Sequence, residues 1–124
     1  MRADSLSVRV DSLMLPPVPS APSQPAFHAV GQEPGWLLDV EPGREIRYVG
    51  DYGDTRVTTP APTFVVDASG TITYDAQTAG APSRRLTVVI RPVPCNDGMS
   101  GAPYTHTVTV RLDGREVRGC GKRQ

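Results

Sequence analysis

The stretch YTHTVTVRLDGREVRGC, residues 104–120, decides the fold because it predicts a complete antiparallel hairpin. Val and Thr alternate before Asp113-Gly114, and Asp-Gly is a preferred pair for the two-residue type I′ turn, in which both residues take positive φ. The resulting register pairs Leu112 with Arg115, Arg111 with Glu116, Val110 with Val117 and Thr109 with Arg118. The valine pair then lies on the inward face of the sheet, and the opposite charges of Arg111 and Glu116 lie on the outer face.

The rest of the chain from Phe27 onward is predicted to alternate short strands with turns. Apolar and polar residues alternate through Trp36–Val40, Ile46–Tyr48, Thr63–Asp67, Thr71–Asp75 and Leu86–Ile90. Thirteen prolines, twelve glycines and only 6% aromatic residues favour such strands over long helices. Because an open sheet exposes its edges, we expect an all-β fold: a small antiparallel β-barrel or sandwich of about seven to nine short strands.

Residues 1–26 differ in composition from residues 27–124. The run PPVPSAPSQPA places five prolines among small polar residues, which predicts a flexible Pro-rich extension or tether. Ahead of it Leu6, Val8 and Val10 alternate with polar residues, so an added strand is an alternative to a disordered terminus. The remaining residues, 27–124, suit a single β-domain of modest core size.

Charge and hydropathy exclude two classes of partner. The 13 basic and 13 acidic residues cancel, so the chain lacks the net positive charge with which proteins bind nucleic acid or an anionic membrane surface. No stretch approaches the roughly 20 apolar residues of a membrane-spanning helix, and the first residues lack the apolar region of a signal peptide. We therefore expect a soluble chain that does not itself insert into a membrane.

The two cysteines lie at the ends of the region that contains the hairpin. Extending the hairpin register places Cys120 opposite Thr107 on the outer face, where Cys95 can reach it. A bridge would close a loop of roughly 25 residues and stabilise the fold by about 3 kcal/mol. A disulfide, which suits an oxidising compartment, is the favoured interpretation; two free thiols, a reactive cysteine or a metal ligand are the alternatives.

Catalytic and metal-binding motifs do not stand out in the chain. It contains no GxSxG, no HExxH and no phosphate-binding glycine loop, so we predict no catalytic residue and no cofactor. His28 and His106 are the only histidines and have no metal-binding spacing; a site that they form with Cys95 and Met99 in three dimensions is the alternative. The segment VGDYGDTR, residues 49–56, is interpreted as a solvated turn because it lacks the pattern of a calcium loop.

Aromatic residues and the run CNDGMSG, residues 95–101, define a candidate binding surface. The segment GQEPGW delivers the only tryptophan onto a strand, where an anchor for the core is the favoured interpretation. If the aromatic side chains instead gather at one rim beside CNDGMSG, they form a patch suited to a small ligand or a protein partner. This candidate surface comprises Trp36, Tyr48, Asn96, Asp97, Met99, Ser100 and Tyr104.

The order of FHAVGQEPGW (27–36), VVIRPVPCNDGMSG (88–101) and the final GC resembles an uncharacterised family of bacterial cell-envelope proteins described as lipoproteins. Members carry a GNEPFW-like segment, a C-x-D-x-M-S segment and a terminal GC, and the match covers roughly residues 27–122. The resemblance implies a periplasmic β-domain on a tether, with the two cysteines bonded to each other, and it supplies no activity. Association of the family with inhibitors of c-type lysozyme adds an inhibitor role as a hypothesis.

The sequence thus predicts a noncatalytic β-domain of the bacterial envelope, exported to the periplasm, that binds an unidentified protein or small ligand. One alternative is an inhibitor of a cell-wall hydrolase such as lysozyme. The other is a metal-binding or redox protein that uses His28, His106, Met99 and the cysteines.

Overall fold

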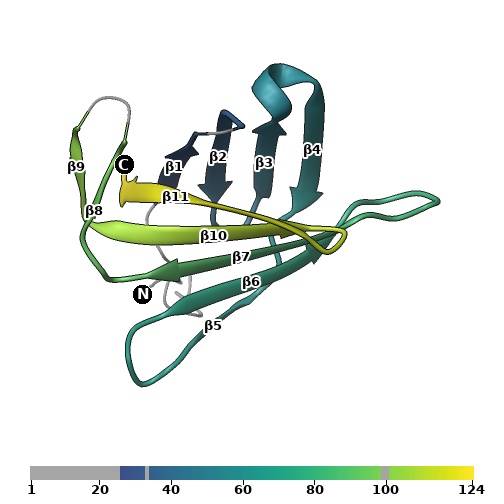
Figure 1. Cartoon of the computed structure of the whole chain (residues 1–124). Helices are drawn as coiled ribbons and strands as arrows, with labels where there is room; N and C mark the ends of the chain where they lie inside the picture. Colours follow the sequence, from purple (N-terminus) through teal and green to yellow (C-terminus); the bar gives the residue numbers. More distant parts are fainter. Residues whose placement is uncertain (1–25, 33, 99–100) are drawn as a thin grey trace, which may run out of the picture.

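The computed structural model describes residues 26–32, 34–98 and 101–124, and this part of the chain is all-β (Figure 1). Its strands are β1 (Phe27–Gly31), β2 (Trp36–Glu41), β3 (Glu45–Gly50), β4 (Thr55–Pro60), β5 (Phe64–Val66), β6 (Ile72–Gln77), β7 (Arg85–Arg91), β8 (Cys95–Asn96), β9 (Pro103–Tyr104), β10 (His106–Leu112) and β11 (Arg115–Arg123). One 3₁₀ turn, η1 (Asp51–Gly53), joins β3 to β4. Residues 1–25 of the expected extension lie outside the described residues.

Nine strands form one antiparallel sheet in the order β4-β3-β2-β1-β11-β10-β7-β6-β5. The sheet curls into a half-barrel: in Figure 1, β1–β4 run across β6, β7 and β10, and the long β11 pairs with both halves. Strands β8 and β9 form a separate two-stranded piece, called the arm below. The predicted all-β fold of short antiparallel strands is confirmed, with a curled half-barrel as its architecture.

The β10–β11 hairpin has the register that its turn predicts. Val110 pairs with Val117, Arg111 with Glu116, and Thr107 with Cys120. Asp113 and Gly114 have φ of 50° and 89°, as a type I′ turn requires. Val110 is fully buried, and Val117 packs partly buried against the core. On the outer face the Arg111 guanidinium donates to the Glu116 carboxylate at 2.8 Å.

Two other turns follow from their glycines. Gly43 has φ of 81°, and the amide of Arg44 donates to the carbonyl of Glu41 at 2.9 Å, which fits a type II turn with Pro42 at its second position and Gly43 at its third. Gly70 has φ of 87° in the β5–β6 hairpin, where the Asp67 carboxylate accepts hydrogen bonds from neighbouring backbone and side-chain donors. These bonds, first the one from the Ser69 hydroxyl, lower the pKa of Asp67.

The core fills the concave side of the sheet with alternate residues of every long strand. Its fully buried or nearly buried apolar side chains are Phe27, Ala29, Trp36, Leu38, Val40, Ile46, Tyr48, Val57, Ile72, Tyr74, Ala76, Leu86, Val88, Ile90, Val108, Val110 and Leu112. The alternation predicted for residues 36–40, 46–48 and 86–90 places the same side chains inward. A strand period of two therefore sets which half of the residues forms the core.

Glycines in β11 leave the space that two aromatic rings occupy. A Cβ on Gly121 would lie 2.4 Å from the Phe27 ring. A Cβ on Gly119 would lie 2.0 Å from the carbonyl oxygen of Val30 and 2.7 Å from the Trp36 ring. Because a strand backbone cannot shift by that much without breaking its ladder, β11 tolerates no side chain at Gly119.

No helix in the part of the chain that the structure describes is long and apolar enough to span a membrane.

Candidate functional site

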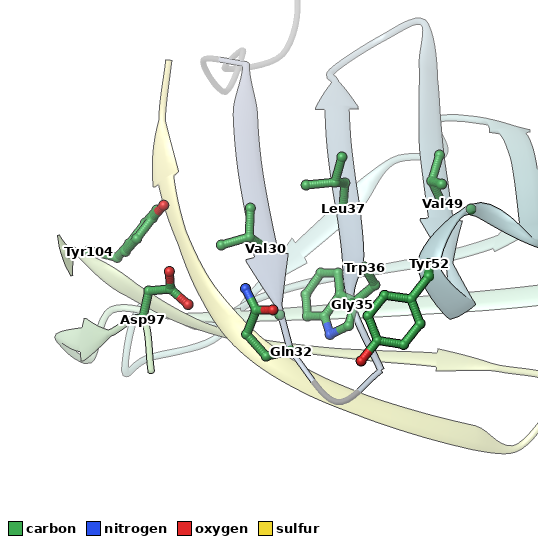
Figure 2. Close-up of a pocket in the computed structure, with 11 residues that line it drawn as sticks. Val30, Gln32, Gly35, Trp36, Leu37, Val49, Tyr52, Asp97 and Tyr104 are labelled. Atoms are coloured by element: carbon green, nitrogen blue, oxygen red, sulfur yellow. The ribbon is translucent and has the colours of Figure 1, made fainter. Parts of the chain in front are cut away.

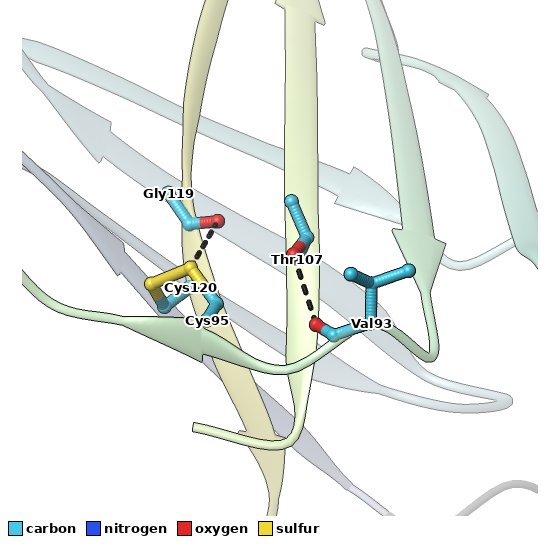
Figure 3. The surroundings of a disulfide bond; sticks show 5 residues. All are labelled: Val93, Cys95, Thr107, Gly119 and Cys120. Atoms are coloured by element: carbon cyan, nitrogen blue, oxygen red, sulfur yellow. Dashed lines mark hydrogen bonds between the residues drawn. A yellow bond between two sulfur atoms is a disulfide. The ribbon is translucent and has the colours of Figure 1, made fainter. Parts of the chain in front are cut away.

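A disulfide joins Cys95 of β8 to Cys120 of β11, with 5.5 Å between the two Cα atoms (Figure 3). Cys120 pairs with Thr107, as the hairpin register predicts, and its side chain lies on the outer face of the sheet. The Thr107 hydroxyl donates to the carbonyl of Val93 at 2.9 Å, which fixes the chain just before the bridge. The two ends of the 95–120 region are therefore clamped to each other, so the cysteines are structural in this fold.

The arm lies against the outer face of β11. Cys95 pairs with Tyr104 across the arm. The Lys122 ammonium of β11 lies 5.6 Å from the centre of the Tyr104 ring, a cation–π contact. The amide of Gly101 donates to the carbonyl of Asp97 at 2.7 Å and tightens the turn of the arm. The disulfide and the cation–π contact together hold Asp97 and Tyr104 beside β1.

A groove of about 610 Å³ separates the arm from the ends of β1, β2 and β3 (Figure 2). Its lining comes from segments far apart in sequence: Val30, Gly31, Gln32, Gly35, Trp36, Leu37, Val49, Tyr52, Gly53, Asp97 and Tyr104. Aliphatic and aromatic side chains predominate, with a few polar groups, which is the usual make-up of a ligand site. None of these described lining residues is a Ser, Thr, Cys, His or Lys, and the titratable groups among them are the Asp97 carboxyl and the hydroxyls of Tyr52 and Tyr104.

Three aliphatic side chains form the floor of the groove and are called the aliphatic row: Val30, Leu37 and Val49. The register aligns them, because Val30 pairs with Leu37 and Leu37 pairs with Val49. They lie on the outer face of the sheet, where strands usually carry polar residues, and the Leu37 residue is 47% exposed. On the other side Val30 pairs with Cys120, so the row leads directly to the disulfide and the arm.

Trp36 borders the groove where β2 begins, but its ring lies on the inner face of the sheet with the core and the residue is only 3% exposed. Its ring packs against Gly31 and Gly119, where any Cβ would overlap it, and lies 6.1 Å from the Tyr48 ring between centroids. The indole Nε1 is buried and has no hydrogen-bond partner. In Figure 2 this nitrogen lies on the side of the ring toward Gln32 and Tyr52. An unmade hydrogen bond of this kind costs about 1–3 kcal/mol, so the N–H retains a strong demand for an acceptor.

Tyr52 flanks the groove from η1 and is 77% exposed. Its φ of 54° follows Asp51 at 51°, and two consecutive non-glycine residues in this left-handed region are uncommon. The Tyr52 amide donates to the carbonyl of Gly35 at 3.1 Å, and a Cβ on Gly35 would lie 3.1 Å from the Tyr52 ring. The absence of a side chain at Gly35 thus lets the Tyr52 ring lie against the β1–β2 turn.

The unusual backbone of η1 is secured by Asp51. Its carboxylate accepts two hydrogen bonds from the Arg115 guanidinium, at 2.8 and 3.1 Å, and one from the Thr55 hydroxyl at 2.6 Å. These bonds, first those from Arg115, hold the pKa of Asp51 below its usual value. Burial, with a contribution from the Asp51 charge, raises the pKa of Tyr48 beneath them. The bridge ties η1 to the start of β11.

The structure brings together three residues of the predicted surface and separates others. Trp36, Asp97 and Tyr104 line the same groove. Tyr48 lies in the core behind Trp36, as an anchor for the core does, and Asn96 is exposed on the arm opposite Pro103 without lining the groove. Met99 and Ser100 lie outside the described residues.

Sequence reasoning missed Tyr52 and the aliphatic row. The sequence predicts only a solvated turn for residues 49–56, yet this segment presents an aromatic ring to the groove. The available signal is the segment GDYGD, residues 50–54, in which Tyr52 lies in a turn-forming run of glycines and aspartates. The row gave a weaker signal, namely Leu37 at a strand position whose neighbours Trp36 and Leu38 already point inward.

The two histidines lie on opposite faces of the sheet. His28 is on the outer face, where its Nδ1 is 2.7 Å from a carboxylate oxygen of Asp39. His106 shares the inner face with Val108, its ring meets the Phe27 ring edge-on at 5.3 Å, and its Nδ1 lies 2.7 Å from the Thr105 hydroxyl. Within the described ranges, no group of three His, Cys, Asp or Glu side chains is placed to bind a metal ion.

The chain matches no known family model, no curated protein and no solved structure.

Proposed function

We propose that this chain is a noncatalytic binding domain of the bacterial cell envelope and that the groove is its binding site. The observation that carries the proposal is the convergence of the β1–β2 turn, η1 and the arm on one mostly apolar groove that leaves Leu37 and Tyr52 exposed. Exposed aliphatic and aromatic side chains that gather in one groove are expected where a ligand or a partner covers them.

The disulfide and the resemblance support the compartment in this proposal. The Cys95–Cys120 bridge suits an oxidising environment outside the cytoplasm. The likeness of the GQEPGW and CNDGMSG segments to envelope proteins supports the periplasm of a bacterium as that environment. Neither observation requires a lipid anchor.

The proposal is tested by a thermal-shift screen with small neutral ligands, followed by calorimetry of the ligands that raise Tm. A ligand at about 100 times its Kd stabilises the folded state by about 2.7 kcal/mol, which is readily measured. Leu37→Thr removes an apolar side chain from the floor of the groove and keeps a strand-compatible residue. Val65→Thr, on a 68% exposed residue outside the groove lining, is the matched control.

The groove is supported as the binding site if ligands bind the wild type and Val65→Thr equally and Leu37→Thr at least about tenfold more weakly. Equal binding to all three proteins would place the binding site elsewhere. Catalytic turnover of any ligand would contradict a noncatalytic role.

A second candidate function, inhibition of a cell-wall hydrolase, is favoured by one observation. The arm is a short two-stranded piece that does not belong to the main sheet (Figure 1), and a short hairpin of this kind is suited to contact an enzyme cleft. Lysozyme assays with the oxidised protein in molar excess test it: loss of activity at stoichiometric amounts is the expected result, and unchanged activity excludes lysozyme as the target.

A further inference from the structure

We propose that a second groove, on the outer face of β7, β10 and β11, binds a phosphate group. This site, called the arginine groove below, has a volume of about 390 Å³ and shares no described lining residue with the groove of the proposed function. Its lining includes three arginines, Arg91, Arg111 and Arg118, and one acid, Glu116. The inference goes beyond the proposed function and is independent of it.

The strand register places the three arginines around Thr109 of β10. Arg118 is its cross-strand pair on β11, and Arg111 lies two residues further along β10. On β7, the strand on the other side of β10 (Figure 1), its pair is Val89, and Arg91 lies two residues beyond. Side chains at such positions share one face of a sheet, with Cβ atoms about 5–8 Å apart. Three long cationic side chains therefore begin close to one hydroxyl group.

Glu116 orients two of the three guanidinium groups but does not neutralise the arginine groove. One oxygen of its carboxylate accepts a hydrogen bond from Arg111 at 2.8 Å, and the other accepts one from Nε of Arg118 at 3.0 Å. These bonds, first the one from Arg111, lower the pKa of Glu116, so its carboxylate is ionised at neutral pH. Arg91 makes no ion pair with any other residue that the structure describes. Three positive charges thus face a single negative charge.

A phosphate group complements the arginine groove in both charge and shape. It carries about 1.5 to 2 negative charges at neutral pH and has three strong acceptor oxygens when it is esterified. The planar guanidinium group binds such oxygens through two parallel hydrogen bonds. The Thr109 hydroxyl, which makes no hydrogen bond to another described residue, adds a donor between the arginines. A carboxylate has only two oxygens and one charge, so it leaves more of these donors unpaired.

The surroundings of the arginine groove favour a small ligand over a polyanion. Asp75 of β6 pairs with Thr87 in the lining and places a carboxylate at the border of the positive area. The chain as a whole has 13 basic and 13 acidic residues. No extended positive field therefore continues from the groove to hold a nucleic acid or an anionic membrane.

Calorimetry at constant ionic strength tests the proposal with inorganic phosphate, glycerol 3-phosphate and succinate as probes. Succinate is a dianion without a tetrahedral group, so it reports the effect of charge alone. We expect at least one of the two phosphate probes to bind with a Kd at or below about 1 mM and at least about tenfold more tightly than succinate. Tighter binding of glycerol 3-phosphate than of inorganic phosphate identifies an ester as the ligand, and otherwise the ligand is the free ion.

Arg91→Gln is the diagnostic variant, because this exposed side chain lines the arginine groove and makes no described ion pair, so its loss should leave Tm nearly unchanged. Arg56→Gln, at an exposed position of β4 outside the lining, removes the same charge and is the matched control. We expect Arg91→Gln to weaken phosphate binding at least about fivefold and Arg56→Gln to leave it unchanged.

Three results would overturn the inference: equal losses in the two variants, affinity for succinate equal to that for the phosphate probes, or no binding of either phosphate probe at about 10 mM. None of these results bears on the groove of the proposed function, because neither arginine belongs to its described lining.

Discussion

Replacing both cysteines, as Cys95→Ala/Cys120→Ala, is expected to lower the free energy of unfolding by about 3.5 kcal/mol. The bridge spans 25 residues, and closing a loop of that length removes about 12 cal/mol/K of entropy from the unfolded chain, which gives this value at 25 °C. For a domain of this size the loss should lower Tm by roughly 14 °C or more. Such a change is a large fraction of the stability of a small domain.

Guanidinium unfolding followed by Trp36 fluorescence measures the change. Wild-type protein with the bridge reduced is the control, because it keeps both cysteine side chains and loses only the cross-link. We expect the reduced protein and the double variant to show nearly the same midpoint, with the far-ultraviolet dichroism of the sheet retained. A loss below about 1 kcal/mol would refute the view that the bridge is the main constraint on the arm.

Three further predictions test the packing and the electrostatics. Gly119→Ala should lower the free energy of unfolding by at least about 1–3 kcal/mol, because the added Cβ meets the Val30 carbonyl. Gly98→Ala is the control and should change stability little, because no atom lies within 4 Å of its added Cβ. Equal unfolding midpoints for the two variants would contradict the β11 packing. Hydrogen bonds lower the pKa of Asp51, so the stabilisation that its carboxylate contributes is present above about pH 4 and is lost as the pH drops through the folded-state pKa. Asp51→Asn should therefore flatten the acid limb of a curve of Tm against pH. An unchanged limb would argue against the Arg115 bridge. Burial and, to a smaller extent, the charge of Arg123 lower the pKa of His106, so the unfolded chain binds the proton more readily. The free energy of unfolding should therefore fall between pH 7.5 and about pH 5.5. The same slope in His106→Gln would assign that pH dependence to other groups.

The β10–β11 hairpin was predictable because its information is local. Asp113-Gly114 fixes a two-residue turn, and once the turn is fixed every later pair follows, including Arg111 with Glu116 and Thr107 with Cys120. The same local reasoning located the inward positions of β2, β3 and β7.

The sheet order and the groove were not predictable because they depend on contacts between distant segments. Nothing local in β1 indicates that it pairs with β11 near the other end of the chain. Val30, Leu37 and Val49 each occupy an unremarkable outward position in their own strands, and only the combined register of β1, β2 and β3 aligns them. The place of the arm depends on the disulfide and on Lys122, both long-range contacts.

The Trp36 indole N–H signal in a two-dimensional ¹⁵N–¹H spectrum tests the binding groove most directly, because the chain has one tryptophan and hence one such signal. The measurement is a titration with a ligand found in the thermal-shift screen. We expect the indole signal and the amide signals of Val30, Leu37 and Tyr104 to move together as the ligand saturates. Saturable shifts confined to another face of the sheet, with the Trp36 signal unmoved, would contradict binding in the groove.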